Sequence, residues 1–113
     1  MKNIISLKNY REFKQVYDAK NVYANRLLVM YVRPNGSDEK RLGITVSKKV
    51  GNSIVRHRVT RLIRESYRLH KESFRTGCDV VFVAKNNAKD QGYRDIEKAM
   101  LHLMKLHGFT ESK

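Results

Sequence analysis

The sequence has few of the residues that cross-link or break up a small fold. Its 113 residues include one cysteine, Cys78, one proline and no tryptophan. A single cysteine excludes an internal disulfide and favours a reducing, cytoplasmic setting, where Cys78 serves as a small buried hydrophobe. No apolar run reaches the roughly 18 residues that a membrane span requires, so we expect no membrane partner.

Acidic residues are also scarce. The chain has 11 Asp and Glu against 24 Lys and Arg, a formal net charge of +13, which predicts a polyanionic partner such as a nucleic acid. Eleven of the cations and only two of the acids lie between Lys40 and Arg75, so about a third of the chain carries +9 of that charge. A surface that is merely soluble would intersperse the two signs.

The sequence lacks the patterns of a catalytic or metal site. Its four histidines and one cysteine form no His-x-x-x-His or Cys-x-x-Cys pair, and no Gly-rich phosphate loop precedes a helix. The few acids form no carboxylate cluster of the kind that a two-metal nuclease uses. We therefore expect no catalytic residues in this chain, and the sequence identifies no metal ligands.

Length and a hydrophobic fraction of 41% predict one folded domain over residues 1–113. Hydrophobic periodicity predicts three helices and four strands. In chain order these are a helix at 10–19, strands at 20–24, 27–33 and 41–47, a helix at 54–74, a strand at 79–84 and a helix at 93–107. This α-β-β-β-α-β-α order predicts an α+β domain in which the strands flanking the middle helix are parallel.

The middle helix separates an apolar stripe from a basic face when successive residues are placed about 100° apart. The stripe that we expect to face the core is Val55, Val59, Leu62, Ile63 and Leu69. The opposite face contains no acid and consists of His57, Arg61, Arg64, Arg68, Lys71 and Arg75. A solvated helix face would mix the two signs, so this face predicts an RNA-binding surface.

Cations also occupy the first turn of this helix, where the helix dipole favours anions. Arg56 and Arg58 lie there, and Lys48 and Lys49 precede them in the loop. We expect these four side chains to form a phosphate-binding locus.

The strand at 41–47 alternates between two kinds of residue. Leu42, Ile44 and Val46 are predicted to face the core, which leaves a small, polar and open face of Gly43, Thr45 and Ser47. On the first helix, Tyr10, Phe13 and Tyr17 share one side. Such rings either pack in the core or stack on bases, and both interpretations stay open here. The last helix has a core stripe of Ile96, Ala99, Met100, Leu103 and Leu106.

The segment from Lys48 to Glu65 closely resembles the signature of the bacterial ribonuclease P protein family. In that family a Ser-Lys-Lys-x-Gly-Asn loop leads into an Arg-Asn-Arg motif, with Arg and Arg-Glu following at the spacings seen here. Segments 24–26, 41–44 and 79–81 also look like family segments, so the resemblance covers nearly the whole chain. The middle asparagine of the family motif is His57 here, a residue that can still donate and accept hydrogen bonds.

The resemblance implies a fold and a division of labour. The fold would be a single-domain α-β-β-β-α-β-α sandwich with a left-handed βαβ crossover, similar to domain 2 of ribosomal protein S5. The RNA subunit of ribonuclease P would carry the chemistry with Mg²⁺, and no further protein partner would be required. Binding of that RNA would fall to Lys48, Lys49, Asn52, Arg56, His57, Arg58, Arg61, Arg64 and Arg68. A cleft for the single-stranded 5′ leader of precursor tRNA would be lined by Phe13, Tyr17, Tyr31, Thr45 and Ser47.

Two other functions are compatible with the basic composition. A ribosomal or other structural RNA-binding protein would share the charge, but it would not explain the Lys-Lys-Val-Gly-Asn loop joined to the arginine array. A self-sufficient nuclease would cut precursor tRNA without an RNA subunit.

Overall fold

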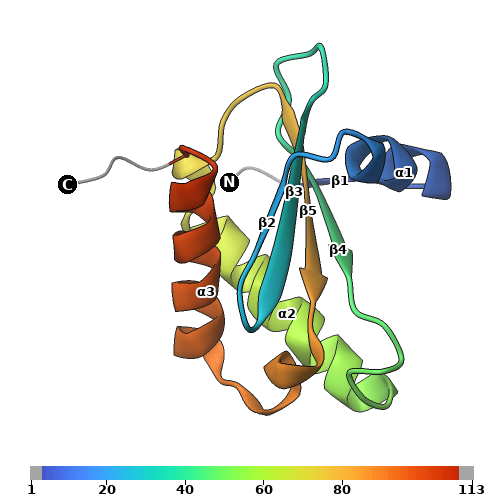
Figure 1. The fold of residues 1–113 in the computed structure, drawn as a ribbon, viewed down its shortest axis with the longest axis vertical. Coiled ribbons are helices and arrows are strands. Elements are labelled where there is room, and N and C mark those ends of the chain that lie inside the picture. Colours follow the sequence, from blue (N-terminus) through green and yellow to red (C-terminus); the bar gives the residue numbers. More distant parts are fainter. Residues whose placement is uncertain (1–3, 110–113) are drawn as a thin grey trace.

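The chain forms one five-stranded sheet with helices packed on both of its faces (Figure 1). The computed structural model describes residues 4–109, so 1–3 and 110–113 of the predicted domain lie outside the described residues. The elements are β1 (Ile5–Ser6), α1 (Tyr10–Asp18), β2 (Val22–Ala24), β3 (Leu28–Pro34), β4 (Arg41–Thr45), α2 (Ser53–Leu69), η1 (Lys71–Ser73), β5 (Cys78–Ala84), η2 (Asn86–Asp90) and α3 (Tyr93–Leu106). The two η elements are short 3₁₀ helices.

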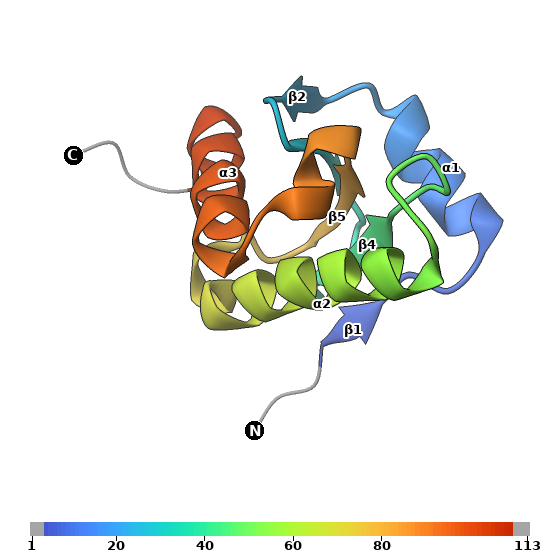
Figure 2. The same ribbon diagram turned by 90° about the horizontal axis from the view of Figure 1, so that it is seen from below.

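β5 lies at the centre of the sheet, whose order is β1-β4-β5-β3-β2. It pairs in parallel with β4 and antiparallel with β3, which confirms the parallel pair expected on either side of the middle helix. In Figure 1, β4 and β5 both run down the page, with β4 on the right. Figure 2, the view from below, shows that α2 lies behind the sheet when the molecule is viewed as in Figure 1. The crossover from β4 through α2 to β5 is therefore left-handed, against the usual rule.

The two faces of the sheet are covered unequally. α2 and α3 pack on one face, and α1 packs alone on the other (Figure 2). The larger core lies under α2 and α3 and includes Val59, Ile63, Phe82 and Met100. The smaller cluster under α1 has only Leu7, Val16 and Val81 fully buried. The α1 side of the sheet is thus the side on which side chains remain partly open.

Several boundaries and faces differ from those predicted. The middle helix ends at Leu69, not near 74, and the chain turns through η1 before β5. Leu69 and Leu106, predicted to face the core, are 54% and 42% exposed, and Tyr67 and Met104 are buried in their place. The helix faces are therefore rotated slightly from the predicted ones. The two-residue strand β1 was also missed, because so short a segment has no periodicity.

Candidate nucleic-acid interface

Gly51 and Asn52 shape the loop that leads into α2. A Cβ on Gly51 would lie 2.8 Å from Val55 Cγ1, so a side chain there would clash with the helix that follows. The Asn52 side chain accepts a hydrogen bond from the Val55 amide at 3.0 Å and caps the helix. Lys48 and Lys49 are exposed in the turn before it. The predicted RNA contact Asn52 thus has a structural role that holds the two lysines at the start of α2.

Two of the predicted RNA-binding arginines bond to the protein backbone. Arg56 Nε donates to the Gly51 carbonyl oxygen at 3.1 Å. Arg58 donates through Nη1 to the Lys89 carbonyl at 3.2 Å and through Nη2 to the Gln91 carbonyl at 2.5 Å. Arg56 is half-buried and Arg58 is exposed, and each uses part of its guanidinium group to bond to the backbone of another segment.

The outer face of α2 presents His57, Arg61 and Arg64. All three side chains are exposed, and none has a hydrogen-bond or ion-pair partner within residues 4–109. Arg68, one turn further on, pairs with Glu65 through two hydrogen bonds of 3.1 and 2.6 Å. Glu65 therefore partly neutralises the charge of Arg68. The position of Arg68 on the helix had placed it on the basic face and did not reveal this pair.

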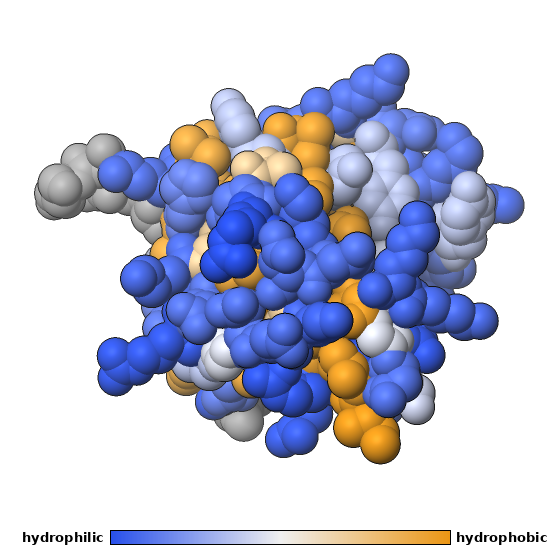
Figure 3. All heavy atoms as spheres, turned by 60° about the horizontal axis from the view of Figure 1, so that its bottom comes forward, coloured by the Kyte–Doolittle hydropathy of each residue, from blue (hydrophilic) through white to orange (hydrophobic). Residues whose placement is uncertain are grey.

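The predicted basic face also ends earlier than the sequence suggested. Lys71 and Arg75 lie beyond the end of α2, and Arg75 sits over the Phe109 ring at 4.8 Å and donates to the Gly108 carbonyl. We use "basic array" for the exposed residues that remain at the start and outer face of α2: Lys48, Lys49, His57, Arg61 and Arg64. Figure 3 shows hydrophilic side chains over most of the face turned toward the viewer, with a narrow band of apolar atoms between them.

The aromatic side chains predicted to line a cleft do gather between α1 and the sheet. Tyr17 on α1 and Tyr31 on β3 meet edge to face with centroids 4.8 Å apart, and the Phe13 ring is 6.5 Å from that of Tyr17. Tyr17 Oη and Thr45 Oγ1 share a hydrogen bond of 3.0 Å. All four side chains are half-buried, and Ser47 is exposed beyond them. We call Phe13, Tyr17, Tyr31 and Thr45 the "aromatic cluster".

Part of the sheet face that was predicted to be open is covered. Gly43 is buried, and a Cβ there would lie 2.6 Å from Phe13 Cε2, so the ring of Phe13 occupies the space above it. Tyr10, at the start of α1, is 77% exposed and lies outside the aromatic cluster. The absence of a side chain at Gly43 therefore lets α1 approach the sheet and does not create room for a ligand.

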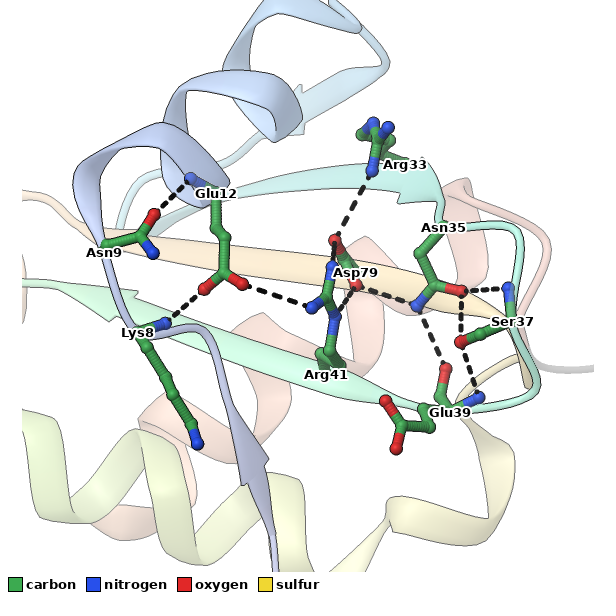
Figure 4. A network of polar contacts seen from close by, with 9 residues as sticks. All are labelled: Lys8, Asn9, Glu12, Arg33, Asn35, Ser37, Glu39, Arg41 and Asp79. Carbon is green, nitrogen blue, oxygen red and sulfur yellow. Dashed lines mark hydrogen bonds and ion pairs between the residues drawn. The ribbon is translucent and has the colours of Figure 1, made fainter.

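A buried carboxylate next to this cluster was missed by sequence reasoning. Asp79 on β5 is fully buried between Arg41 of β4 and Arg33 of β3, its neighbours across the sheet (Figure 4). Arg41 donates to both Asp79 oxygens at 2.8 Å, and Asn35 donates to Oδ1 at 2.8 Å. The hydrogen bonds from Arg41 to the Asp79 carboxylate raise the pKa of the Arg41 guanidinium above its ordinary value.

The same network reaches α1. Arg41 Nη1 lies 3.3 Å from Glu12 Oε2, and Glu12 Oε1 accepts from the Lys8 amide ahead of the helix (Figure 4). Asn9 caps α1 by accepting a hydrogen bond from the Glu12 amide. The network thus ties the start of α1 to the centre of the sheet. In the sequence, the one sign of this network is Asp79 itself, an acidic residue at the start of an otherwise apolar strand.

The described residues do not fit a metal ion held by the protein. Within residues 4–109, no three His, Cys, Asp or Glu side chains lie together in a group that could hold one. Asp79, the buried acid, has both oxygens bonded to Arg41. In the same part of the chain, no helix is long and apolar enough to cross a membrane.

A family model, Ribonuclease P, matches residues 1–107 of the sequence. The chain belongs to the ribonuclease P protein family. It is 51% identical over 107 residues to the ribonuclease P protein component of Lachnoclostridium phytofermentans, covering 95% of this chain and 92% of that one. It is 48% identical over 105 residues to the component from Alkaliphilus oremlandii, covering 93% and 92%.

Solved ribonuclease P proteins share the fold. The Staphylococcus aureus protein superposes with a TM-score of 0.87 at 32% identity, over 96% of this chain and all of that one. The Thermotoga maritima protein superposes with a TM-score of 0.81 at 26% identity, over 95% and 98%. The α+β fold expected from the resemblance is therefore confirmed.

Proposed function

We propose that this ribonuclease P protein binds the RNA subunit through its basic array and the single-stranded 5′ leader of precursor tRNA through its aromatic cluster. In this arrangement it promotes endonucleolytic removal of the leader, which leaves the mature 5′ end of the tRNA. The RNA subunit supplies the catalytic chemistry with Mg²⁺, and this chain contributes no catalytic residue. The setting is the cytoplasm.

The observation that carries the proposal is the basic array itself. Its two lysines and two arginines are exposed and have no acidic partner within residues 4–109. A surface that served only solubility would intersperse acids among these cations. Arginine forks and lysine ammonium groups in this state suit phosphate oxygens.

The aromatic cluster supports binding of the leader. Tyr17 and Tyr31 pack against the smaller core cluster but remain partly exposed. Bases of any sequence can stack on an aromatic face, provided that they are unpaired. A variable, single-stranded leader meets that condition, whereas the paired acceptor stem of mature tRNA does not.

Reconstitution tests the proposed function. The purified chain is added to a bacterial ribonuclease P RNA, and cleavage of precursor tRNA is measured at low magnesium. We expect the protein to accelerate cleavage there, because its cations replace part of the charge screening that the metal supplies. Cleavage by the protein without the RNA would contradict the non-catalytic role. The absence of any stimulation with the RNA would contradict the proposal as a whole.

A further inference from the structure

A hollow beside His57, which belongs to the basic array, has been assigned no ligand of its own so far. It has a volume of about 290 Å³ and lies between the end of β4 and the first two turns of α2. Its lining residues are Ile44, Val46, Ser53, Arg56, His57 and Thr60. This volume is close to the lower limit of about 300 Å³ for ligand pockets, so the hollow suits a group as small as one planar ring system.

The floor of the hollow is apolar because β4 is only partly covered. Ile44 and Val46 pack against the main core but remain partly exposed. β1 pairs with β4 only at Arg41 and Leu42, after which the chain leaves to form α1 on the other face. Apolar surface of this kind favours a flat apolar group over a free phosphate ion.

The rim of the hollow is made of polar groups that have no partner in the protein. The Ser53 and Thr60 hydroxyls and the His57 ring have no hydrogen bond within residues 4–109. Arg56 bonds to Gly51 through Nε only, so its two terminal nitrogens stay available. No carboxylate lines the hollow, whereas basic-array residues Lys48 and Lys49 precede it in the chain.

We propose that this hollow, which we call the "His57 slot", receives one unpaired nucleobase of the ribonuclease P RNA. The base would lie on Ile44 and Val46 with His57 beside it, and the hydroxyls and Arg56 would meet its polar edge and flanking phosphate. Proteins read splayed-out RNA bases by stacking them on aromatic rings or Arg guanidinium planes and by hydrogen bonds to the base edges. His57, Arg56 and the two hydroxyls are placed to make such contacts here. This inference rests on the proposed function and adds a base contact to the phosphate contacts of the basic array.

The test fills the His57 slot without changing charge. Val46→Phe places a ring where the base would lie, and the dissociation constant for a bacterial ribonuclease P RNA is measured over a series of salt concentrations. We expect binding to weaken at least about fivefold at every salt concentration, because the new ring displaces the base from His57 and stacking of a base on an aromatic side chain contributes roughly 1–3 kcal/mol. The slope against log salt should stay unchanged, since no phosphate contact is lost.

Leu69→Phe is the control, since Leu69 is an exposed apolar residue at the far end of α2 and does not line the slot. It should bind as the unchanged protein does. His57→Ala covers the case in which Val46→Phe fails to fold, because the exposed His57 has no partner in the described residues. His57→Ala should also weaken binding at all salt concentrations.

A crosslink identifies the occupant directly. Cys78 is buried, and burial raises the pKa of its thiol, so an engineered Ser53→Cys offers the reactive thiol for a photoactivatable aryl azide. We expect a crosslink to one unpaired nucleotide, which the same label at Leu69→Cys does not give. Normal affinity in both slot variants, or a changed salt slope, would overturn the His57 slot. Failure of the unchanged protein to bind the RNA would instead overturn the proposed function.

Discussion

Arg58 and Arg61 lie three residues apart on α2, yet their guanidinium groups meet different surroundings. Arg58 donates to two carbonyl oxygens at the end of η2, whereas Arg61 is exposed and has no partner within residues 4–109. The sequence presents both as members of one arginine array. The structure assigns Arg58 a part in joining α2 to η2, and it leaves Arg61 free for a ligand.

We expect Arg61→Ala to weaken binding of ribonuclease P RNA by about 1–3 kcal/mol without changing the free energy of unfolding. Arg58→Ala should lower the free energy of unfolding by about 1 kcal/mol, because it removes the hydrogen bonds to η2. Urea denaturation and RNA-binding measurements on both variants check this contrast. A loss of stability in Arg61→Ala would show that the outer face of α2 has been assigned wrongly.

Loss of the Asp79 carboxylate should lower the free energy of unfolding strongly. In Asp79→Asn, the guanidinium of Arg41 loses the carboxylate that accepts two of its hydrogen bonds. Removing one partner of a buried ion pair costs about 3–5 kcal/mol, and urea denaturation measures that loss. Asp90→Asn, an exposed acid at the end of η2, is the control and should unfold as the unchanged protein does. Equal stability of the two variants would contradict a structural role for the network.

α1 brings together the groups that form the aromatic cluster. It is anchored at its start by Arg41 and Glu12 and along its length by Phe13 over Gly43. These contacts fix the position of Tyr17 relative to Tyr31 on the sheet. The cluster therefore depends on how the helix docks as much as on the rings themselves.

We expect Tyr17→Ala and Tyr31→Ala to lower affinity for precursor tRNA by about 1–3 kcal/mol and to change affinity for mature tRNA little. The reason is that stacking requires the unpaired leader. The measurement compares both RNAs bound to the reconstituted complex. Tyr10→Ala is the matched control on the same helix, since its ring is 77% exposed and outside the cluster. An equal loss of affinity for the two RNAs would show that these rings only pack against the core and do not bind the leader.

Sequence patterns predicted most elements because the helices, β3 and β4 have a clear period and β5 is a continuous apolar run. The parallel strands around α2 follow from the strand–helix–strand order, and the shared side of Phe13 and Tyr17 follows from their spacing. The burial of Asp79 does not, because it depends on the alignment of β5 with two strands that are distant in sequence. The hydrogen bonds of Arg58 depend likewise on where η2 lies. The features that the sequence could not predict are therefore those that depend on contacts between segments distant in the chain.

The net charge of +13 should govern how the whole protein responds to salt. Lys48, Lys49, Arg61 and Arg64 are the lysines and arginines of the basic array, and each phosphate contact contributes roughly 0.7–0.9 to the slope of log affinity against log salt. For binding of ribonuclease P RNA we therefore expect log affinity to fall with log salt at a slope of about −3 or steeper. Arg64→Ala should make the slope shallower by about one phosphate contact. A flat response in the unchanged protein would exclude the basic array as the main RNA surface.

The central place of β5 in the sheet determines when the protein can fold during its synthesis. β5 separates β3 from β4, and it is the last strand of the sheet in chain order. Until Ala84 has left the ribosome, the two earlier strands have no common partner and the main core cannot close. The basic helix α2 emerges before that moment, next to ribosomal RNA. The nascent chain therefore carries its cationic helix past a large polyanion while its fold is still incomplete.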